Sequence, residues 1–276
     1  MLLNKIFVRK KLKEFLLEDI GHQDITTDNL SFEKDVKAKI IAKEDCTICG
    51  VEFAKQVFDI IDNTLVFSFF IPDGSEVKKG ETILEIQGNG KSILKAERVA
   101  LNILQRLSGI STNTKKYVNL LEGTNTKILD TRKTTPGFRA FEKYAVKIGG
   151  GFNHRFALYD MVMLKDNHIS LAGGIKKAVQ EIRSNVSPMV KIEVEVSNLE
   201  EFKEALELNV DIIMLDNMSI KEMEKAVKLN NGKSLLEASG NITLENIKEI
   251  AKTGVDFISS GALIHSAKWV DLSLRF

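Results

Sequence analysis

The sequence predicts an α/β fold that combines a parallel barrel with a separate N-terminal domain. After Gly109, short apolar runs alternate with stretches of helical periodicity, which is typical of parallel strands joined by crossover helices. Before Gly109 the pattern differs, since glycine-punctuated β-branched runs lie between helical segments. We therefore expect an N-terminal α/β domain over residues 1–109 and a barrel domain over residues 110–264. The tail 265–276 is a candidate addition to the first domain.

The N-terminal domain shows helical periodicity at both ends and strand-like runs between them. Hydrophobic residues recur at helical spacing near the start and again in KAERVALNILQRL. The run VFSFFI and the β-branched segments after it are punctuated by Gly74, Gly80 and Gly88, which is typical of hairpins. In chain order we expect helix 4–18, strand 36–42, helix 51–61, hairpin strands within 66–88 and helix 95–107.

Six strands are expected in the second domain, and nearly every one ends in a charged or small polar residue. In a barrel such strand ends converge on one rim, where active sites of this architecture lie. In an open sheet only the ends near a switch point could share a ligand, so the pattern favours a barrel. The strands are expected to end at Thr131, Lys165, Val196, Asp216, Ser239 and Ser260, with helices over 174–183, 199–208, 220–229 and 244–253 and N-caps at Asn198 and Ser219.

The composition is that of a globular chain with little excess charge. Its 276 residues carry 39 lysines and arginines against 38 acidic residues, a formal net charge of +1. This balance argues against general binding to nucleic acid or to a membrane surface. No apolar run approaches the ~20 residues of a membrane helix, and the charged N-terminus does not resemble a signal peptide. We expect a cytoplasmic protein in which Cys46 and Cys49 are reduced.

A cationic stretch between Asp130 and Ile169 is the strongest functional signal. The segments TRK, NHR and LKD each place cations beside a strand end or a glycine run. Arginine grips a carboxylate or phosphate through two parallel hydrogen bonds, whereas lysine supplies a point charge. The convergence of these cations predicts a pocket for a small, highly charged anion. The candidate ligands of the anion are Thr131, Arg132, Lys133, His154, Arg155 and Lys165.

Acidic residues at the ends of two neighbouring strands suit a divalent cation. Glu193 and Glu195 lie two apart in VEVEV and face the same side of the strand, and Asp216 ends the next strand. Buried carboxylates are costly unless they are paired or bind a metal, and hard oxygen ligands suit Mg²⁺. Glu195 and Asp216 are the expected Mg²⁺ ligands, partly through substrate and water. Ion pairs with Lys165 and Lys133 are the alternative, and both roles can coexist.

Two loops near the C-terminus have the composition of phosphate-binding loops. The segments SLLEASGN and FISSGA each place serine and glycine directly after a strand. Small residues allow backbone N–H groups to approach a phosphate, and the late loops of a barrel commonly bind one. Phosphate contacts are expected from Ser239, Gly240, Asn241, Ser259, Ser260 and Gly261.

These motifs occur together, and in this order, in one known family. TRKTTPG, EKYAV, GGGFNHR and KDNH, with ERVALN, EVEV, MLDNM, EASG and SSGALIHS, resemble the quinolinate phosphoribosyltransferase family over essentially the whole chain. The resemblance implies that quinolinate and phosphoribosyl pyrophosphate give nicotinate mononucleotide, pyrophosphate and CO₂, with Mg²⁺, in NAD biosynthesis. It also implies an N-terminal α/β sandwich that is hammerhead-like and an irregular, incomplete α/β barrel.

The resemblance further implies roles for individual residues. One group of side chains would hold the two carboxylates of quinolinate, and a second would hold the phosphoribosyl donor and its metal. The first group comprises Arg132, His154, Arg155 and Lys165; the second comprises Lys133, Glu195, Asp216 and the two serine–glycine loops. Lys133, Lys165, Glu195 and Asp216 would take part in catalysis.

Two further residues stand out from the comparison with the family pattern. Arg98 belongs to ERVALN, which resembles the element that reaches into a partner subunit's site. A homodimer that shares Arg98 across its interface is therefore implied as the minimum assembly. Asn241 replaces the second glycine of the usual ASGG, and a side chain there could crowd the phosphate. Because asparagine tolerates left-handed backbone angles, we expect altered donor affinity rather than lost function.

Three other functions fit parts of the sequence. The nearest is a paralogous phosphoribosyltransferase-like protein of the molybdenum-transport-associated type, although the KDNH segment and the complete set of cations argue against it. A barrel lyase would use Lys165 to form a Schiff base. A biotinyl or lipoyl carrier has turns like those of PDGSEVKKGETILEIQG, but no lysine at an exposed hairpin tip is evident in that segment.

Overall fold

The computed structural model describes residues 3–276 and separates into two compact units, each with its own sheet. The first unit contains the chain up to Lys115 together with residues 135–150 and 267–276, and the second contains residues 116–134 and 151–266. The C-terminal tail therefore belongs to the first unit. No helix within the described residues has the length and apolar character that a bilayer crossing requires.

The first unit combines helices with a mainly antiparallel arrangement of strands. Its helix α4 runs on into the second unit, and its last strand comes from the C-terminal tail. The elements are α1 (Lys5–Ile20), α2 (Ile25–Asn29), β1 (Asp35–Ala42), β2 (Cys46–Thr47), α3 (Val51–Ile61), β3 (Val66–Phe70), β4 (Glu76–Val77), β5 (Thr82–Asn89), α4 (Gly90–Leu120), α5 (Arg139–Ile148) and β12 (Leu272–Arg275).

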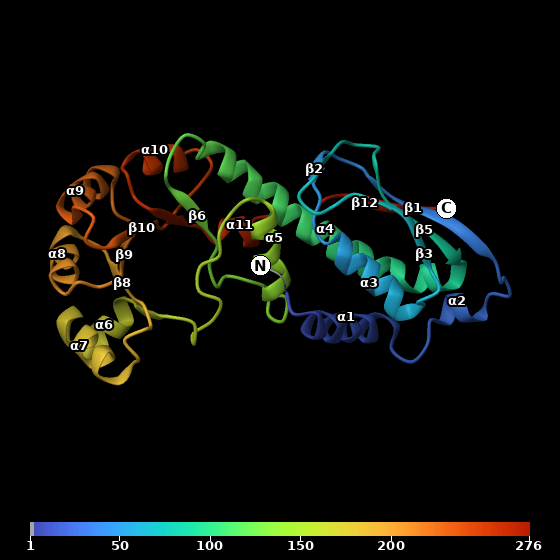
Figure 1. Cartoon of the computed structure of the whole chain (residues 1–276), viewed down its shortest axis with the longest axis horizontal. Helices are drawn as coiled ribbons and strands as arrows, with labels where there is room; N and C mark the ends of the chain where they lie inside the picture. Colours follow the sequence, from blue (N-terminus) through green and yellow to red (C-terminus); the bar gives the residue numbers. More distant parts are fainter. Residues whose placement is uncertain (1–2) are drawn as a thin grey trace. The chain divides into compact units, whose positions relative to one another are not determined.

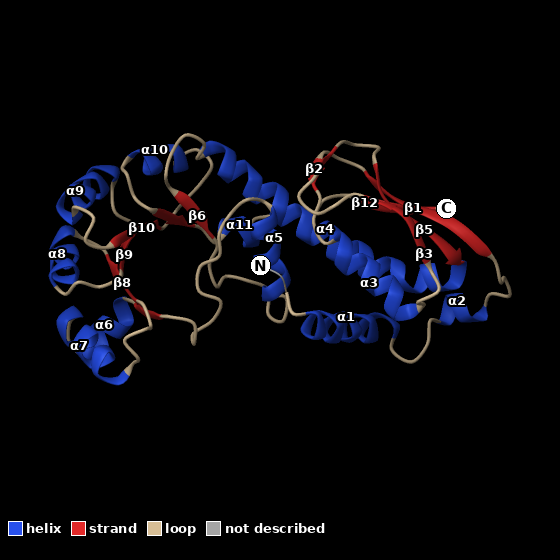
Figure 2. Cartoon of the chain, in the orientation of Figure 1, coloured by secondary structure: helices blue, strands red, loops and turns tan. Residues whose placement is uncertain are grey.

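The main sheet of this unit has the order β12-β1-β5-β3, and all its pairs are antiparallel (Figure 2). Alternate residues of β1, namely Ala38, Ile40 and Ala42, are buried, because successive side chains of a strand point to opposite faces. Phe58 of α3 packs on Phe67 of β3, with ring centroids 6.3 Å apart. The sheet therefore buries one face against helices.

The expected hairpin within residues 66–88 is correct in one pairing and wrong in another. Strands β3 and β5 are antiparallel neighbours, but the connection between them leaves the sheet, because β4 pairs with β2 instead. Gly74 and Gly80 make the turns of this connection with φ angles of 91° and 94°, which glycine adopts without strain. The sequence pattern marked the turns without showing which strands they join.

A partly buried carboxylate fixes the start of α3. Asp73 accepts the backbone N–H groups of Gly50 and Val51, both at 2.9 Å, so a residue distant in sequence satisfies the free N–H groups of this helix. The other oxygen of Asp73 accepts the hydroxyl of Tyr144 at 2.8 Å. This contact ties α5 to the rest of the first unit.

The second unit is a parallel α/β structure in which strands and helices alternate. Its helices α7 to α10 lie along the outside of the strands (Figure 1). The elements are β6 (Lys127–Leu129), β7 (Val162–Leu164), α6 (Asp166–Ala172), α7 (Ile175–Asn185), β8 (Ile192–Val196), α8 (Leu199–Glu207), β9 (Ile212–Asp216), α9 (Ile220–Asn230), β10 (Leu235–Ser239), α10 (Ile247–Lys252), β11 (Phe257–Ser259) and α11 (Ala262–His265).

The strand order β6-β11-β10-β9-β8-β7 is parallel throughout. Because β6, the first strand of this unit, lies beside β11, the last strand of this unit, the sheet curls back on itself as a barrel does. Phe152 bridges to Leu129 on the other side of β6, but no ladder joins β6 to β7 within the described residues. The expected irregular barrel is confirmed, and it is incomplete between these two strands.

The expected strand ends and caps of this unit agree with the structure. Each of the six strands occurs within a few residues of its expected position. Asn198 accepts the N–H of Glu201, and Ser219 accepts the N–H of Glu222 in a capping box. These caps confirm the helix starts that the sequence predicted.

Candidate active site

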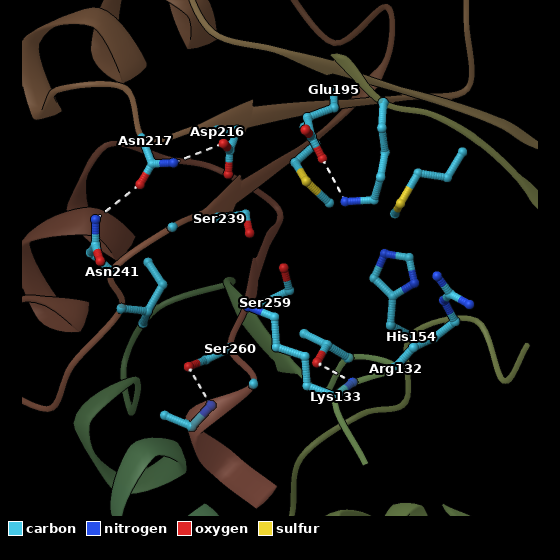
Figure 3. Close-up of a pocket in the computed structure, with 18 of the residues that line it drawn as sticks. Arg132, Lys133, His154, Glu195, Asp216, Asn217, Ser239, Asn241, Ser259 and Ser260 are labelled. Carbon is cyan, nitrogen blue, oxygen red and sulfur yellow. Dashed lines mark hydrogen bonds and ion pairs between the residues drawn. The ribbon is translucent and has the colours of Figure 1, made fainter. Parts of the chain in front are cut away.

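The carboxyl ends of the barrel strands surround a cavity of about 890 Å³ (Figure 3). All the lining residues belong to the second unit. Every expected site residue except Arg98 lines the cavity. These residues are Thr131, Arg132, Lys133, His154, Arg155, Lys165, Glu195, Asp216, Ser239, Gly240, Asn241, Ser259, Ser260 and Gly261.

Arg132 and Arg155 form the cationic side of the cavity together with their neighbours. Arg132 is exposed, whereas Arg155 is only 8% exposed and donates to the Met161 carbonyl at 3.1 Å. Burial lowers the pKa of Arg155, and repulsion from Arg132 adds to the effect. Two guanidinium groups held this close repel each other, so an anion bound between them is favoured.

The segment that carries His154 is organised by a buried aspartate. Asp130 is fully buried just after β6, and its two oxygens accept the Asn153 side-chain amide at 2.7 Å and the His154 backbone N–H at 2.9 Å. Phe152 extends the backbone pairing from the same segment. The polar Asp130 at the strand end therefore positions the NHR motif beside the cavity.

Lys165 and Glu195 face each other across neighbouring strands. Lys165 follows β7 and Glu195 lies on β8, and their side chains form an ion pair of 2.9 Å. Figure 3 shows Glu195 at the cavity. The ion pair that was expected as an alternative role for Glu195 is therefore present. The corresponding pair between Lys133 and Asp216 does not occur within residues 3–276.

Asp216 is oriented by two asparagines rather than by a lysine. The side-chain amide of Asn217 donates to Asp216 Oδ2 at 2.8 Å, and the amide of Asn241 donates to Asn217 Oδ1 at 3.0 Å (Figure 3). Asn217 and Asn241 have φ angles of 53° and 52°, which confirms the left-handed backbone expected for Asn241. With Glu195 on the adjacent strand, Asp216 supplies the hard carboxylate oxygens that suit Mg²⁺.

The two serine–glycine loops have close backbone approaches that exclude larger residues. A Cβ atom on Gly240, whose φ is 95°, would collide with Asn217 Oδ1, and one on Gly261 would lie 2.8 Å from Lys133 Cδ. The Ser259 hydroxyl is buried and has no hydrogen-bond partner within the described residues. An unpartnered hydroxyl beside two glycines is suited to donating a hydrogen bond to a phosphate oxygen.

Arg98 was expected in the site, whereas His265 and Glu237 were not singled out from the sequence. Arg98 is exposed on α4 in the first unit and does not line this cavity. His265 does line it, and Glu193 and Glu237 lie beneath it around His154. Their positions two residues before Glu195 and Ser239 on the same strands were the available signal.

Comparison with known proteins identifies relatives over the full length of the chain. Residues 110–275 match the family described as quinolinate phosphoribosyl transferase, C-terminal domain, and residues 24–108 match the corresponding N-terminal domain. A probable nicotinate-nucleotide pyrophosphorylase (carboxylating) from Synechocystis sp. is 46% identical over 273 residues, or 98% of this chain and 92% of the relative. A protein of the same name from Bacillus subtilis is 43% identical, over 99% and 94%.

Solved structures agree with the sequence relatives. The nicotinate-nucleotide pyrophosphorylase from Francisella tularensis superposes with a TM-score of 0.94 at 44% identity. The match covers 99% of this chain and 97% of that structure. Both domains of the chain are thus shared with this relative, and the similarity is not confined to the barrel.

Proposed function

The chain belongs to the quinolinate phosphoribosyltransferase family, and from this premise we propose that it transfers the phosphoribosyl group of phosphoribosyl pyrophosphate to quinolinate. The products are nicotinate mononucleotide, pyrophosphate and CO₂, which makes the chain an enzyme of de novo NAD biosynthesis. The observation that carries the proposal is the cavity at the strand ends, where cations from separate segments meet two serine–glycine loops.

Quinolinate carries two adjacent carboxylates on a pyridine ring, and the cationic side of the cavity matches it. Arg132, Arg155 and Lys165 reach the cavity from different segments, with Thr131 and His154 beside them. Guanidinium groups donate paired hydrogen bonds to carboxylates, and burial of Arg155 reduces the screening of its charge by water. Their role is to hold the ring so that its nitrogen faces the ribosyl carbon.

The phosphoribosyl donor fits the opposite side. Small residues after β10 and β11 allow backbone N–H groups to approach phosphate oxygens. Lys133 packs against Gly261, so its ammonium group can offset the negative charge of the departing pyrophosphate. The residues assigned to the donor are Ser239, Gly240, Asn241, Ser259, Ser260, Gly261 and Lys133.

Glu195 and Asp216 are the residues that would hold Mg²⁺. Both present carboxylate oxygens to the cavity from adjacent strands, and Asn217 orients Asp216. Bound there with substrate oxygens and water, Mg²⁺ would neutralise charge on the pyrophosphate group. Their negative charge would also stabilise the positive charge that develops at the ribosyl carbon of a bound donor.

Loss of CO₂ needs no acid or base group from the side chains of the cavity. Once the ring nitrogen is bonded to the ribosyl carbon it is positively charged, so it stabilises the electron pair left on the adjacent ring carbon when the carboxylate departs as CO₂. That carbon then takes up a proton from water. The protein's part in this step is to keep the ring and its remaining carboxylate in place through Arg132 and Arg155. No residue of the cavity needs to act as a dedicated acid or base for it.

The proposal includes a homodimer or larger assembly in the cytoplasm, with no nucleic-acid or membrane partner. Arg98 supports the assembly, because it is exposed on α4 and absent from the lining of the cavity of its own chain. Its ERVALN segment resembles the family element that completes a partner's site. Cys46 and Cys49 are buried free thiols.

One assay tests the proposed reaction. The purified chain is incubated with quinolinate, phosphoribosyl pyrophosphate and Mg²⁺, and the release of CO₂ and the formation of nicotinate mononucleotide are followed together. We expect equal amounts of the two products and little turnover when nicotinate replaces quinolinate, since nicotinate lacks the second carboxylate. Equal turnover of nicotinate, or no turnover of quinolinate, would contradict the proposal.

A further inference from the structure

Beneath the cavity, two buried carboxylates surround one imidazole ring. Glu193 of β8 and Glu237 of β10 have side-chain exposures of 0% and 1%, and their Oε2 atoms lie 3.2 and 3.4 Å from Nε2 of His154. The His154 side chain is itself only 7% exposed. The reaction proposed above assigns no role to either glutamate.

Both ring nitrogens of His154 are engaged. The backbone N–H of Arg155 donates to Nδ1 at 2.7 Å, so the ring proton lies on Nε2, the nitrogen that faces the glutamates. Glu193 and Glu237 hold the ring from the Nε2 side. A proton on Nδ1 would break the bond from Arg155.

Stability does not explain this arrangement. Apart from the contacts to Nε2, both oxygens of Glu193 and Oε1 of Glu237 have no hydrogen-bond partner among residues 3–276. Burial raises the pKa of Glu193. Apolar side chains in place of buried ionic groups are often neutral or stabilising, so the pair of glutamates points to a functional constraint.

His154 links these carboxylates to the segment that carries Arg155. The ring is held through Nε2 on one side, and through Nδ1 it holds the backbone N–H of the next residue. The guanidinium of Arg155 lines the cavity and donates to the Met161 carbonyl at 3.1 Å. A change in the orientation of the ring therefore changes the backbone from which Arg155 projects.

We propose that Glu193 and Glu237 are positioning residues for the acceptor, which anchor Nε2 of His154 and thereby fix the segment that directs Arg155 into the cavity. The inference rests on the proposed function, because it takes the acceptor to be a dicarboxylate that Arg155 binds. It adds two residues that act on the acceptor without touching it. The strands that carry Glu193 and Glu237 also carry Glu195 and Ser239, which are assigned to the donor. A general disturbance of these strands would therefore weaken binding of both substrates, whereas lost positioning of Arg155 weakens binding of the acceptor alone.

Neutralising one of the two glutamates has two opposite effects on quinolinate binding, one through the lost charge and one through the lost anchor of the ring. Removing a negative charge beneath the cavity would by itself favour a doubly anionic acceptor. Removing the anchor of the ring releases the Arg155 segment and weakens the same acceptor. Weaker quinolinate binding in a glutamine variant therefore reports lost positioning, because the change in charge acts in the other direction.

The test uses Glu237→Gln and Glu193→Gln in the full-length protein. Quinolinate affinity is measured by calorimetry without the donor, and KM is measured for both substrates. We expect quinolinate binding to weaken about tenfold, as for the loss of other outer-shell partners, while KM for phosphoribosyl pyrophosphate changes by less than about twofold. The matched control is Glu207→Gln, which removes an exposed charge at the end of α8. Its affinity for quinolinate and both KM values should equal those of the wild type.

His154→Ala completes the experiment. If the glutamates act through the ring, His154→Ala/Glu237→Gln binds quinolinate like His154→Ala alone. Unchanged or stronger quinolinate binding in the glutamine variants overturns the inference. It is also overturned if His154→Ala/Glu237→Gln loses as much affinity for quinolinate as the two single losses multiplied together. Failure of both glutamine variants to fold also overturns it, since the cluster would then be structural. Turnover of quinolinate by the wild type tests the proposed function separately.

Discussion

At the scale of single residues, burial separates Arg155 from the other described cations that line the cavity, which are partly or fully exposed. Arg155→Ala should leave a carboxylate of quinolinate without its partner. We expect binding to weaken by roughly 2–4 kcal/mol, measured by calorimetry. Lys221→Ala removes an exposed cation from α9 and should have no effect. Normal quinolinate binding by Arg155→Ala would show that the carboxylate-binding role is assigned wrongly.

Asn241 tests how the donor loop tolerates a side chain where the family usually has glycine. Its amide bonds Asn217, which in turn bonds Asp216. Asn241→Gly keeps the left-handed backbone accessible but removes one hydrogen bond from this chain, so we expect KM for phosphoribosyl pyrophosphate to rise about two- to tenfold. KM for quinolinate should stay constant.

The control is Asn231→Gly, which changes the same residue type at a similar φ angle of 46° at the end of α9. It should leave both KM values unchanged, because Asn231 does not line the cavity. An unchanged donor KM in Asn241→Gly would mean that the asparagine pair does not support donor binding.

The two cysteines should be unreactive in the folded protein. Burial, with Glu44 and Asp45 nearby, raises the pKa of Cys46 to about 11, and burial also holds the pKa of Cys49 well above its usual value. Because the thiolate is the reactive form, labelling by iodoacetamide at pH 8 should be very slow in the native protein and fast for both thiols in denaturant. Labelling of Cys46 should accelerate only as the pH approaches 11. Rapid labelling of the native protein at pH 8 would contradict this burial.

At the scale of elements, a buried ion pair holds α5 in the first unit. Glu142 is fully buried and accepts Arg106 at 2.7 and 3.1 Å, together with the Thr135 backbone N–H at 2.8 Å. Glu142→Ala removes the carboxylate that pairs with the largely buried Arg106, and we expect the free energy of unfolding of this unit to fall by about 3–5 kcal/mol.

Urea denaturation of the two proteins measures that loss. The control is Glu249→Ala, which removes an ion pair with Lys252 on α10 whose side chains are 61% and 59% exposed, and should change stability by less than about 1 kcal/mol. Equal stability losses in the two variants would mean that the buried pair contributes no more than a surface one.

Helix α5 also shows where prediction from sequence fails. Its residues were read for their charge, and no helix was expected there, because Glu142 and Lys143 occupy buried positions that charged side chains rarely take. Hydrophobic periodicity therefore understated its buried face. By contrast, α3 and the strands of the barrel follow apolar periodicity closely, and their ends were predicted within a few residues.

The residues of the candidate site also fall into those that could be predicted from the sequence and those that could not. Residues at strand ends, such as Lys165, Asp216 and Ser239, could be grouped from the sequence because parallel strands of a barrel end at one rim. The partners of His154 could not be predicted, because Glu193 and Glu237 lie on strands distant in sequence and only the assembled sheet brings them to the ring. Pairing across a sheet is a non-local property that periodicity does not contain.

At the scale of the whole molecule, the proposed assembly depends on Arg98. This residue is exposed in the first unit, while the cavity lies within the second. If each site takes Arg98 from the partner, Arg98→Ala and Lys165→Ala each inactivate both sites of a homodimer. A hybrid of the two variants nevertheless contains one site in which Arg98 and Lys165 are both present.

Mixing the two inactive variants should therefore restore activity. Random exchange in an equal mixture gives about half hybrid dimers with one intact site each, so we expect about a quarter of wild-type activity. A mixture of Arg155→Ala and Lys165→Ala is the matched control. Because both residues line the cavity of one chain, each hybrid site lacks one of them and no activity should return. If subunit exchange is demonstrated by differential tagging and the first mixture still stays inactive, Arg98 does not act across the interface.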